Sequence, residues 1–357
     1  MNPLFTIAVT TYNRRDLLKQ TLSSILGQTF PDFEVIVGND YTKESLSLRD
    51  LGSDDSRIRI VNHPQNLGEL ENMNALLRMS RGRYFALIAD DDLYAPNFLK
   101  AVHAAIVKFD SPVCVYTSFI DGSAIPDEEY DVEGKAFLLS GSEFVNRYFA
   151  QKLKALGNMG VFDREYLIKS NGFESLNSGA IALYMEYLHI VKAAVVDRVA
   201  YVNAPLIIYR VHEGSWGFTN KDQEQYKIAG ENLVRRSVEF FQRPELRRHF
   251  KRNLTALLRF VMSDYVIVSR RSEGFHLPKL IAYFGHARKY IRSLKGSELF
   301  LSAFVSLLQA EAWLAWVLLK QKILAVAPRF LIRAFYAARS FFYREPIGTV
   351  KSIYNPQ

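Results

Sequence analysis

The first 120 residues alternate between short apolar runs and segments with apolar residues at helical spacing, and this alternation constrains the fold more than any other feature. The expected strands span 4–9, 33–37, 57–61, 84–88 and 113–119. The expected helices span 14–26, 67–79 and 96–109. Alternating strands and helices form a parallel sheet with right-handed crossovers and helices on both faces. The sequence therefore predicts an α/β fold on a mostly parallel sheet.

The pattern after residue 120 is less regular and then becomes helical. Helices are expected over 142–151, 163–170 and 181–194, with a strand at 159–162 and one or two strands within 195–211. From about residue 225 onward the pattern is helical throughout. We expect a domain over 1–218 and a helical C-terminal region over 219–357.

Charge is divided unevenly between these two parts. Residues 235–357 hold 22 Lys and Arg against 7 Asp and Glu, a net of +15, which leaves −7 for residues 1–234 of a chain whose total is +8. The basic part suggests an anionic partner. Cys114 is the only cysteine, so no internal disulfide is possible, and the N-terminal residues do not resemble a secretory signal. We expect a protein of the cytoplasmic side.

Three polar clusters, at 10–13, 38–40 and 90–92, follow expected strands where those strands end. Open α/β sheets bind ligands beyond the carboxyl ends of their strands. Although the clusters are far apart in sequence, they would share one rim of the sheet. We expect the ligand site there.

Asp90, Asp91 and Asp92 form the most informative cluster. Three consecutive acids repel one another unless a cation or several donors compensate their charge. Mg²⁺ is usually held by one or two carboxylates plus substrate phosphates, and it neutralises charge on a leaving phosphate. The alternative is a solvated turn in which Asp92 caps the helix that begins near Pro96. The position at the mouth of a parallel sheet favours a metal-assisted site.

The other candidates each have a structural alternative. Asp40 could accept a hydrogen bond from a nucleobase or be a turn residue. Thr10, Thr11 and Asn13 could contact a nucleotide or cap the first helix. The segment 66–68 is either a turn or a loop beside a phosphate.

Glu186 and His212 lie outside the rim clusters. Glu186 is surrounded by apolar residues in an expected helix, which would raise its pKa and suit a general base; alternatively it lies on an exposed stripe. His212 could be a metal ligand, with Arg210 gripping phosphate, or a polar loop residue.

Taken together, these segments resemble glycosyltransferase family 2, and the resemblance covers roughly residues 4–216. The segments that carry it are 10–14, 39–40, 66–68, 74–75, 81–84, 89–96, 171–174 and 209–212. The resemblance implies a GT-A fold, which is a Rossmann-like, mostly parallel sheet with helices on both faces, here followed by a C-terminal helical region. It also implies an inverting transfer from a nucleotide-diphosphate sugar, most often of UDP, to a hydroxyl of a glycan or lipid-linked acceptor.

Roles for individual residues also follow from the resemblance. The nucleotide-sugar contacts would be Thr10, Tyr12, Asn13, Asp40, Asn66, Asp90 and Asp91. The ligands of a Mn²⁺ or Mg²⁺ ion would be Asp91, Asp92 and His212. The chain departs from the family pattern at Ala89, where another acid is common, and at the catalytic base, which is usually the aspartate of a Glu-Asp pair. Here the corresponding helix offers Glu186 as the catalytic base, with Glu174 as the second choice.

The basic C-terminal region suggests an anionic membrane surface as a further partner. The segment 299–319 is almost wholly apolar and long enough to span a membrane, but Glu311 near its middle opposes a simple span. Further on, Arg329, Arg333 and Arg344 share a helical face, beside the apolar Phe330, Leu331, Phe335, Phe341 and Phe342. We expect peripheral attachment to the cytoplasmic face of the plasma or inner membrane; a soluble helical bundle and a true span are the alternatives.

Three other functions are alternatives to a glycosyltransferase of surface-polysaccharide assembly. A nucleotidyltransferase would need a glycine-rich, basic loop after the first strand, and 10–14 has no glycine. Nucleic-acid binding is not expected, because no recognition motif accompanies the basic tail. A non-catalytic membrane scaffold or pseudoenzyme stays open because the region of the base is altered, although the retained acids argue against it.

Overall fold

The computed structural model describes residues 2–124, 129–178, 181–212 and 222–272, together with 285–326 except for residues 286, 289, 293 and 296. The chain forms two compact units. The first comprises Met1–Phe144 and Ala155–Ala229, and the second comprises Val145–Lys154 and Gly230–Gln357. The domain boundary expected at residue 218 stays a prediction.

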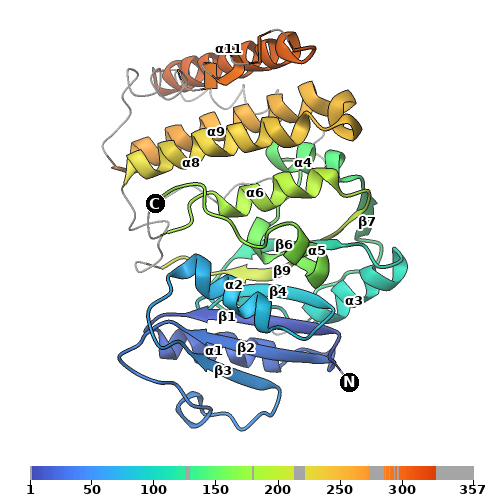
Figure 1. Ribbon diagram of the computed structural model, residues 1–357, viewed down its shortest axis with the longest axis vertical. Helices are drawn as coiled ribbons and strands as arrows, with labels where there is room; N and C mark the ends of the chain where they lie inside the picture. The colour runs from blue at the N-terminus through green and yellow to red at the C-terminus, as the bar shows by residue number, and fades with distance from the viewer. Residues whose placement is uncertain are drawn as a thin grey trace. The chain divides into compact units, whose positions relative to one another are not determined.

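The first unit begins with four parallel strands in the order β3-β2-β1-β4. They are β1 Phe5–Thr11, β2 Phe33–Asn39, β3 Ile58–Asn62 and β4 Tyr84–Ala89. The helices α1 Arg15–Leu26 and α2 Glu69–Met79 cover opposite faces of these strands (Figure 1), as right-handed crossovers in opposite directions require. The mostly parallel sheet with helices on both faces is confirmed.

The second half of the sheet mixes parallel and antiparallel pairs. The short strand β8 Val161–Asp163 lies antiparallel between β4 and β6 Cys114–Asp121, and β9 Val199–Tyr209 runs parallel to β6. Two strands that we did not expect, β5 Leu93–Tyr94 and β7 Ala136–Leu139, pair antiparallel with β9. A two-residue strand is too short to leave a periodic signal. Since β4, β6 and β9 run in one direction, their carboxyl ends share one edge.

The inner strands are buried on both faces, which explains why they are continuously apolar. Ile7, Val9, Val35 and Ile88 have no exposed surface. The helix α3 Phe98–Lys108 packs against β6 and β9.

Three further helices belong to the region after residue 120: α4 Gly141–Phe149, α5 Arg164–Lys169 and α6 Met185–Lys192. The helix predicted over 181–194 is therefore shorter than expected at its N-terminal end. Tyr184 adopts a left-handed backbone, with φ of 60°, and a helix cannot extend through it.

The described residues of the second unit are helical, as predicted from residue 225 onward. They include most of α8 Gln223–Phe241, which begins in the first unit, the 3-10 helix η4 Pro244–His249, α9 Phe250–Ser272 and α11 Phe300–Val326. α11 packs along α9 (Figure 1). The predicted amphipathic face with Arg329, Arg333 and Arg344 lies outside the described residues.

Candidate active site

Asp90 is fully buried immediately after β4 and is held by groups from the end of β1 and from the segment that follows it. The Thr11 hydroxyl donates to its Oδ2 at 2.6 Å, and Arg14 Nε donates to the same oxygen at 3.3 Å. A second Arg14 nitrogen forms an ion pair with Asp90. The β1 and β4 segments thus meet at the carboxyl edge, as the rim argument predicted.

Asp91 is the accessible acid of the cluster. Its Oδ2 accepts a hydrogen bond from Arg14 Nη1 at 2.7 Å and lies 3.2 Å from His212 Nε2. The Asp91 side chain retains 13% of its surface and that of His212 retains 31%. Arg14 therefore bridges two acids, and His212, which follows β9, joins them.

Asp92 is buried and faces the backbone. Its Oδ1 accepts the backbone N–H of Arg210 at 2.8 Å. The Arg210 side chain donates to the backbone carbonyl oxygen of Asp91 and to the side-chain oxygen of Gln20. The Thr21 hydroxyl lies 2.8 Å from the carbonyl oxygens of both Asp90 and Asp92. The alternative in which Asp92 caps α3 is wrong, because the N-cap residue of that helix is Asn97.

Burial dominates the ionisation of this cluster. It raises the pKa of Asp90 to about 6, although the charge of Arg14 and the Thr11 hydrogen bond act in the opposite direction. Burial, followed by the charge of Asp91, raises the pKa of Asp92 well above its usual range. Several donors compensate these acids, but they do not restore ordinary acidity, so a cation beside the cluster would still be favourable.

The donor set suits a divalent cation that shares its ligands with a substrate. Within the described parts of the chain, no group of three or more His, Cys, Asp or Glu residues forms a ready metal cage. Asp91 and His212 nevertheless present one carboxylate and one imidazole side by side, which is sufficient where phosphate oxygens supply other ligands. The Asp92 carboxylate faces the Arg210 N–H, and its role as a metal ligand stays a prediction.

Asp40 occupies the next position along the rim. Its N–H donates to the Thr11 carbonyl at 3.1 Å, which places it beside the Asp90 partner. Its carboxylate accepts the N–H groups of Leu67 at 2.7 Å and Gly68 at 2.8 Å, and the Asn66 side chain also accepts the Gly68 N–H at 2.9 Å. The loop at 66–68 is therefore fixed onto the end of β2, and Asp40 is only 4% exposed.

Tyr12 is half exposed at the same rim and meets Tyr41 edge to face, with ring centroids 5.3 Å apart. Asn13 adopts a left-handed backbone with φ of 54°. No side chain caps α1, so the capping alternative for Thr10, Thr11 and Asn13 is wrong. Tyr41 was missed, although an aromatic residue directly after Asp40 is a signal that could have identified it.

Glu186 lies half-buried in the first turn of α6. Gly157 packs directly on its backbone, since a Cβ there would lie 2.0 Å from the Glu186 carbonyl oxygen. The link from this segment to the rim runs through Glu69, whose Oε2 accepts the Ala182 N–H at 3.3 Å. The Glu69 side chain is otherwise exposed to solvent. Glu69 is a site residue that the sequence analysis did not single out.

The turn at 171–174 is bound to both α2 and α6 by side-chain hydrogen bonds. The Asn74 side chain accepts the Phe173 N–H at 3.0 Å and donates to the Phe173 carbonyl at 2.9 Å. Lys192 Nζ donates to the Gly172 carbonyl at 2.9 Å and pairs with Glu174 at 2.6 Å. Glu174, the second choice for a base, is therefore engaged in a nearly buried ion pair.

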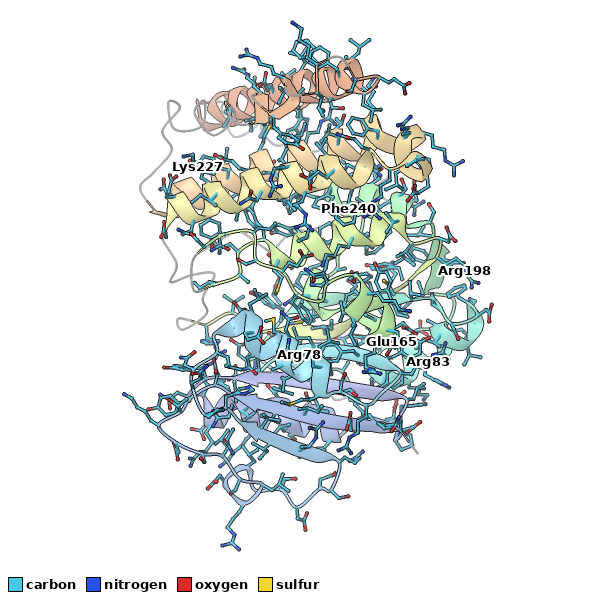
Figure 2. All side chains as sticks on the ribbon, in the orientation of Figure 1. Arg78, Arg83, Glu165, Arg198, Lys227 and Phe240 are labelled. Carbon is cyan, nitrogen blue, oxygen red and sulfur yellow. The ribbon has the colours of Figure 1, made fainter. Side chains whose placement is uncertain are left out.

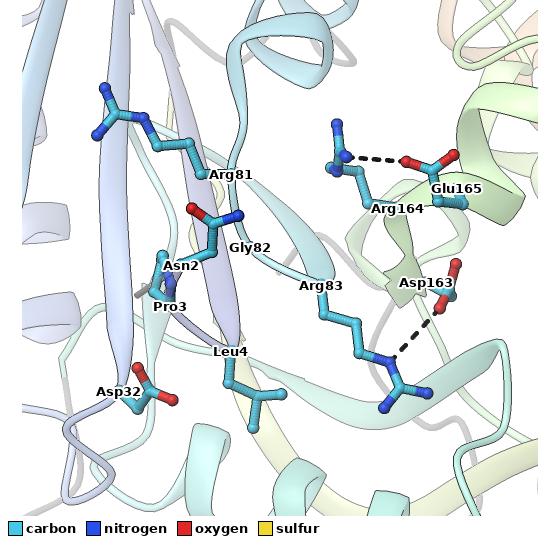
Figure 3. Close-up of a pocket in the computed structure, with 10 residues that line it drawn as sticks. All are labelled: Asn2, Pro3, Leu4, Asp32, Arg81, Gly82, Arg83, Asp163, Arg164 and Glu165. Carbon is cyan, nitrogen blue, oxygen red and sulfur yellow. Dashed lines mark hydrogen bonds and ion pairs between the residues drawn. The ribbon is translucent and has the colours of Figure 1, made fainter.

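A pocket of about 370 Å³ lies at the other edge of the sheet (Figure 3). Its lining includes Leu4, Arg83 and Asp163, at the amino ends of β1 and β4 and the carboxyl end of the antiparallel β8. This concave surface is separate from the rim that carries the acids.

The model of glycosyl transferase family 2 matches residues 6–163, a range that contains the acids of the rim. The glycosyltransferase GlyA of Streptococcus pneumoniae is 25% identical over 225 residues, which cover 59% of this chain and 31% of that protein. The UDP-Glc:alpha-D-GlcNAc-diphosphoundecaprenol beta-1,3-glucosyltransferase WfgD of Escherichia coli is 27% identical over 105 residues, covering 29% of this chain and 42% of WfgD. The chain thus spans less than half the length of these relatives.

Residues 1–349 of Staphylococcus aureus TarS, solved in complex with UDP-GlcNAc, have a similar structure. The TM-score is 0.61 at 16% identity, and the match covers 87% of this chain and 89% of that one. The fold is GT-A, as the resemblance implied.

Proposed function

Because the chain carries a glycosyltransferase family 2 domain, we propose that it transfers a sugar from a nucleotide-diphosphate sugar, with UDP as the nucleotide, to a hydroxyl of a glycan or lipid-linked acceptor. The observation that carries this proposal is the convergence of Asp90, Asp91 and His212 with Arg14 at the carboxyl edge of the sheet. The UDP-GlcNAc complex of TarS and the substrates in the name of WfgD support the choice of donor and acceptor class.

In this proposal the rim is divided between the two ends of the nucleotide. Tyr12, with Tyr41 beside it, offers an aromatic surface to the base, and Asp40 offers carboxylate lone pairs that its two backbone partners leave free. Thr10, Asn13 and Asn66 complete this end. Asp90 is the proposed contact of the ribose hydroxyls, which requires the Arg14 side chain that pairs with it to move, since the carboxylate is fully buried here.

The diphosphate end lies at Asp91 and His212. These two residues would hold a Mn²⁺ or Mg²⁺ ion, which would neutralise charge on the departing nucleoside diphosphate. Arg14 and Arg210 add fixed positive charge around the same acids. Both guanidinium groups are held by neighbouring groups before any substrate enters, which is the preorganisation that electrostatic stabilisation requires.

Glu186 is the proposed general base. It would take the proton from the acceptor hydroxyl, whose oxygen attacks the anomeric carbon as the bond to the nucleoside diphosphate breaks. Attack on the face opposite the leaving group inverts the anomeric configuration. We further propose that the protein associates with the membrane and acts in surface-polysaccharide assembly on the cytoplasmic side.

A non-catalytic scaffold that binds nucleotide without transfer is the second candidate. It is favoured by one observation, namely that the expected aspartate base is replaced by Glu186, preceded by Met185. Glu186→Gln separates the two. If Glu186 is the base, its loss should lower kcat by at least about a hundredfold with little change in donor binding. A scaffold would show no transfer before or after the change.

The first test is calorimetric titration of the protein with UDP, GDP and dTDP, each with Mn²⁺ and with EDTA. We expect binding of UDP that depends on the metal and is lost in Asp91→Ala. Glu165→Ala, at the opposite edge of the sheet, is the control and should bind normally. Well-folded protein that binds none of the three nucleotides would overturn the enzyme proposal.

A further inference from the structure

We propose that α11 lies flat in one leaflet of an anionic membrane, with its outward face among the lipid chains and the residues around η4 against the headgroups. This inference rests on the proposed function in one respect, because a lipid-linked acceptor requires the enzyme to work at a membrane. The residues that otherwise support it lie in the second unit.

The two faces of α11 differ in what covers them. One face packs against α9 and is formed by Ala303, Ser306, Leu307, Ala310 and Leu314, all at most 5% exposed. The opposite face carries large apolar side chains that stay exposed: Leu301 at 70%, Phe304 at 41%, Leu308 at 47% and Trp316 at 57%. Both sets recur at steps of mostly three or four residues, so each forms a stripe along the helix.

The exposed stripe contains no charged residue. Ala312 and Ala315 continue it between Leu308 and Trp316. At about 100° per residue, Gln309 and Glu311 fall at its two borders. An apolar face of this length on the described surface is the kind of patch that marks an interaction site.

The structure favours a helix in the membrane plane over a helix that crosses it. The segment Phe300–Leu318 is long and apolar enough to span. However, Glu311 pairs with Arg288 at 2.8 Å, and the Ser306 hydroxyl donates to the Lys251 carbonyl of α9 at 3.2 Å. A span that kept these contacts would draw Arg288, Glu311 and the start of α9 into hydrocarbon, at high cost. A helix in the membrane plane keeps them in or near the interface.

The basic residues around η4 identify the lipid as anionic. Residues 243–252 hold five Arg or Lys side chains and one acid, Glu245. Arg247 pairs with Glu298 at 3.2 Å, which places this basic cluster beside the start of α11 at Phe300. Arg248 and Lys251 are exposed. A second copy of the chain could cover the apolar stripe, but an anionic bilayer complements the stripe and the basic cluster together.

The test is flotation of the full chain with vesicles of phosphatidylcholine alone or with about one third phosphatidylglycerol. We expect binding to the anionic vesicles only. Phe304→Glu with Leu308→Glu should weaken it at least about tenfold, because two inserted side chains are lost. Val107→Glu, which is 67% exposed on α3, is the matched apolar control. Arg248→Glu with Lys251→Glu should also weaken binding, against Lys43→Glu with Lys169→Glu as the matched charge control.

Orientation can be measured with spin labels, because Cys114 is the only cysteine and is fully buried. Labels at Leu301→Cys, Leu308→Cys and Trp316→Cys should all report the same shallow depth. A label at 308 that reaches the bilayer centre while 301 and 316 stay near the interfaces would overturn the flat placement.

Equal binding of the Phe304→Glu, Leu308→Glu variant, or a chain that dimerises through these residues without binding vesicles, would overturn the membrane proposal. Neither assay uses a nucleotide sugar. Failure here with metal-dependent UDP binding intact would therefore remove the membrane site alone, whereas vesicle binding without UDP binding would remove the enzyme proposal alone.

Discussion

The two edges of the sheet in the first unit both carry arginines and acids, but they use them differently. At the carboxyl edge, Arg14 reaches across 76 and 77 positions of sequence to the buried Asp90 and the partly exposed Asp91. At the amino edge, Arg83 approaches Asp163 only to 3.8 Å, and its side chain is 56% exposed. Arg83 and Glu165, both labelled in Figure 2, line the pocket at this edge.

The difference shows why a concave surface alone does not identify the active site. The 370 Å³ pocket lies at the amino edge, where charges are exposed and contribute little. Burying acids costs free energy, and folds accept such costs mainly at functional sites. The carboxyl edge bears that cost, because burial has raised the pKa of Asp90 and Asp92 there.

The largest expected effect separates the two edges by activity. Asp91→Asn should lower kcat/KM for sugar transfer by on the order of a thousandfold, since it removes the accessible charge that we propose faces the diphosphate. Glu165→Gln at the amino edge should stay within about twofold. Initial rates with a UDP-sugar and Mn²⁺ measure both. An equal fall in kcat/KM for the two variants would mean that the carboxyl edge is no better a candidate for the active site than the amino edge.

The second effect is on stability and has an unusual sign. A carboxyl whose pKa is about 6 in the folded protein and ordinary in the unfolded chain stays protonated only in the fold, so stability falls as pH rises from about 4 to 6. Asp90→Asn removes this loss and should be more stable than the parent by roughly 2–3 kcal/mol at pH 8, while being impaired in transfer.

Urea unfolding in EDTA between pH 4.5 and 8 measures the difference in free energy of unfolding between Asp90→Asn and the parent. This difference should shrink toward pH 4. Asp163→Asn at the amino edge is the comparison, because the asparagine oxygen can still accept the Tyr166 N–H that Asp163 caps. A stability difference for Asp90→Asn that stays constant over this range would contradict the raised pKa of Asp90.

Much of this edge could be predicted from the sequence, because strand order and strand ends follow from apolar runs and turns. The clusters around Thr11, Asp40 and Asp90 were expected on one rim and lie there. The partners within the rim could not be predicted. Whether Asp92 faces a metal or the Arg210 N–H depends on the pairing of β5 with β9, and that pairing joins residues 115 positions apart.

Glu69 and the start of α6 were missed for a similar reason. The apolar pattern of 181–194 continues through Tyr184, and only its left-handed backbone ends the helix there. The role of Glu69 depends on the loop that this break creates, because Ala182 donates to its carboxylate. Local periodicity reports which side of an element is buried, but it does not report which distant backbone group an acid will meet.

The third effect tests Glu69 against a neighbour on the same helix. Glu69→Gln should lower kcat about tenfold with a smaller change in donor KM, because a neutral amide oxygen accepts the Ala182 N–H less strongly than the carboxylate and so loosens the loop that precedes Glu186. Glu71→Gln, whose side chain is exposed and paired with Arg78, should have no effect. Unchanged melting temperatures would exclude general destabilisation, and similar rates for both variants would remove Glu69 from the site.

The smallest effect concerns the amino edge itself. Arg83→Met should change the free energy of unfolding by less than about 0.5 kcal/mol, because its ion pair with Asp163 is long and exposed to solvent. Arg14→Met breaks a pair with a buried acid and should cost roughly 3 kcal/mol near pH 8, and less near pH 5, where Asp90 is already protonated in the fold. Urea unfolding of both variants at the two pH values measures the contrast. If Arg83→Met lowered the free energy of unfolding as much as Arg14→Met, the ion pair at the amino edge would stabilise the fold as strongly as the one at the carboxyl edge. The pocket at the amino edge would then become a second candidate site.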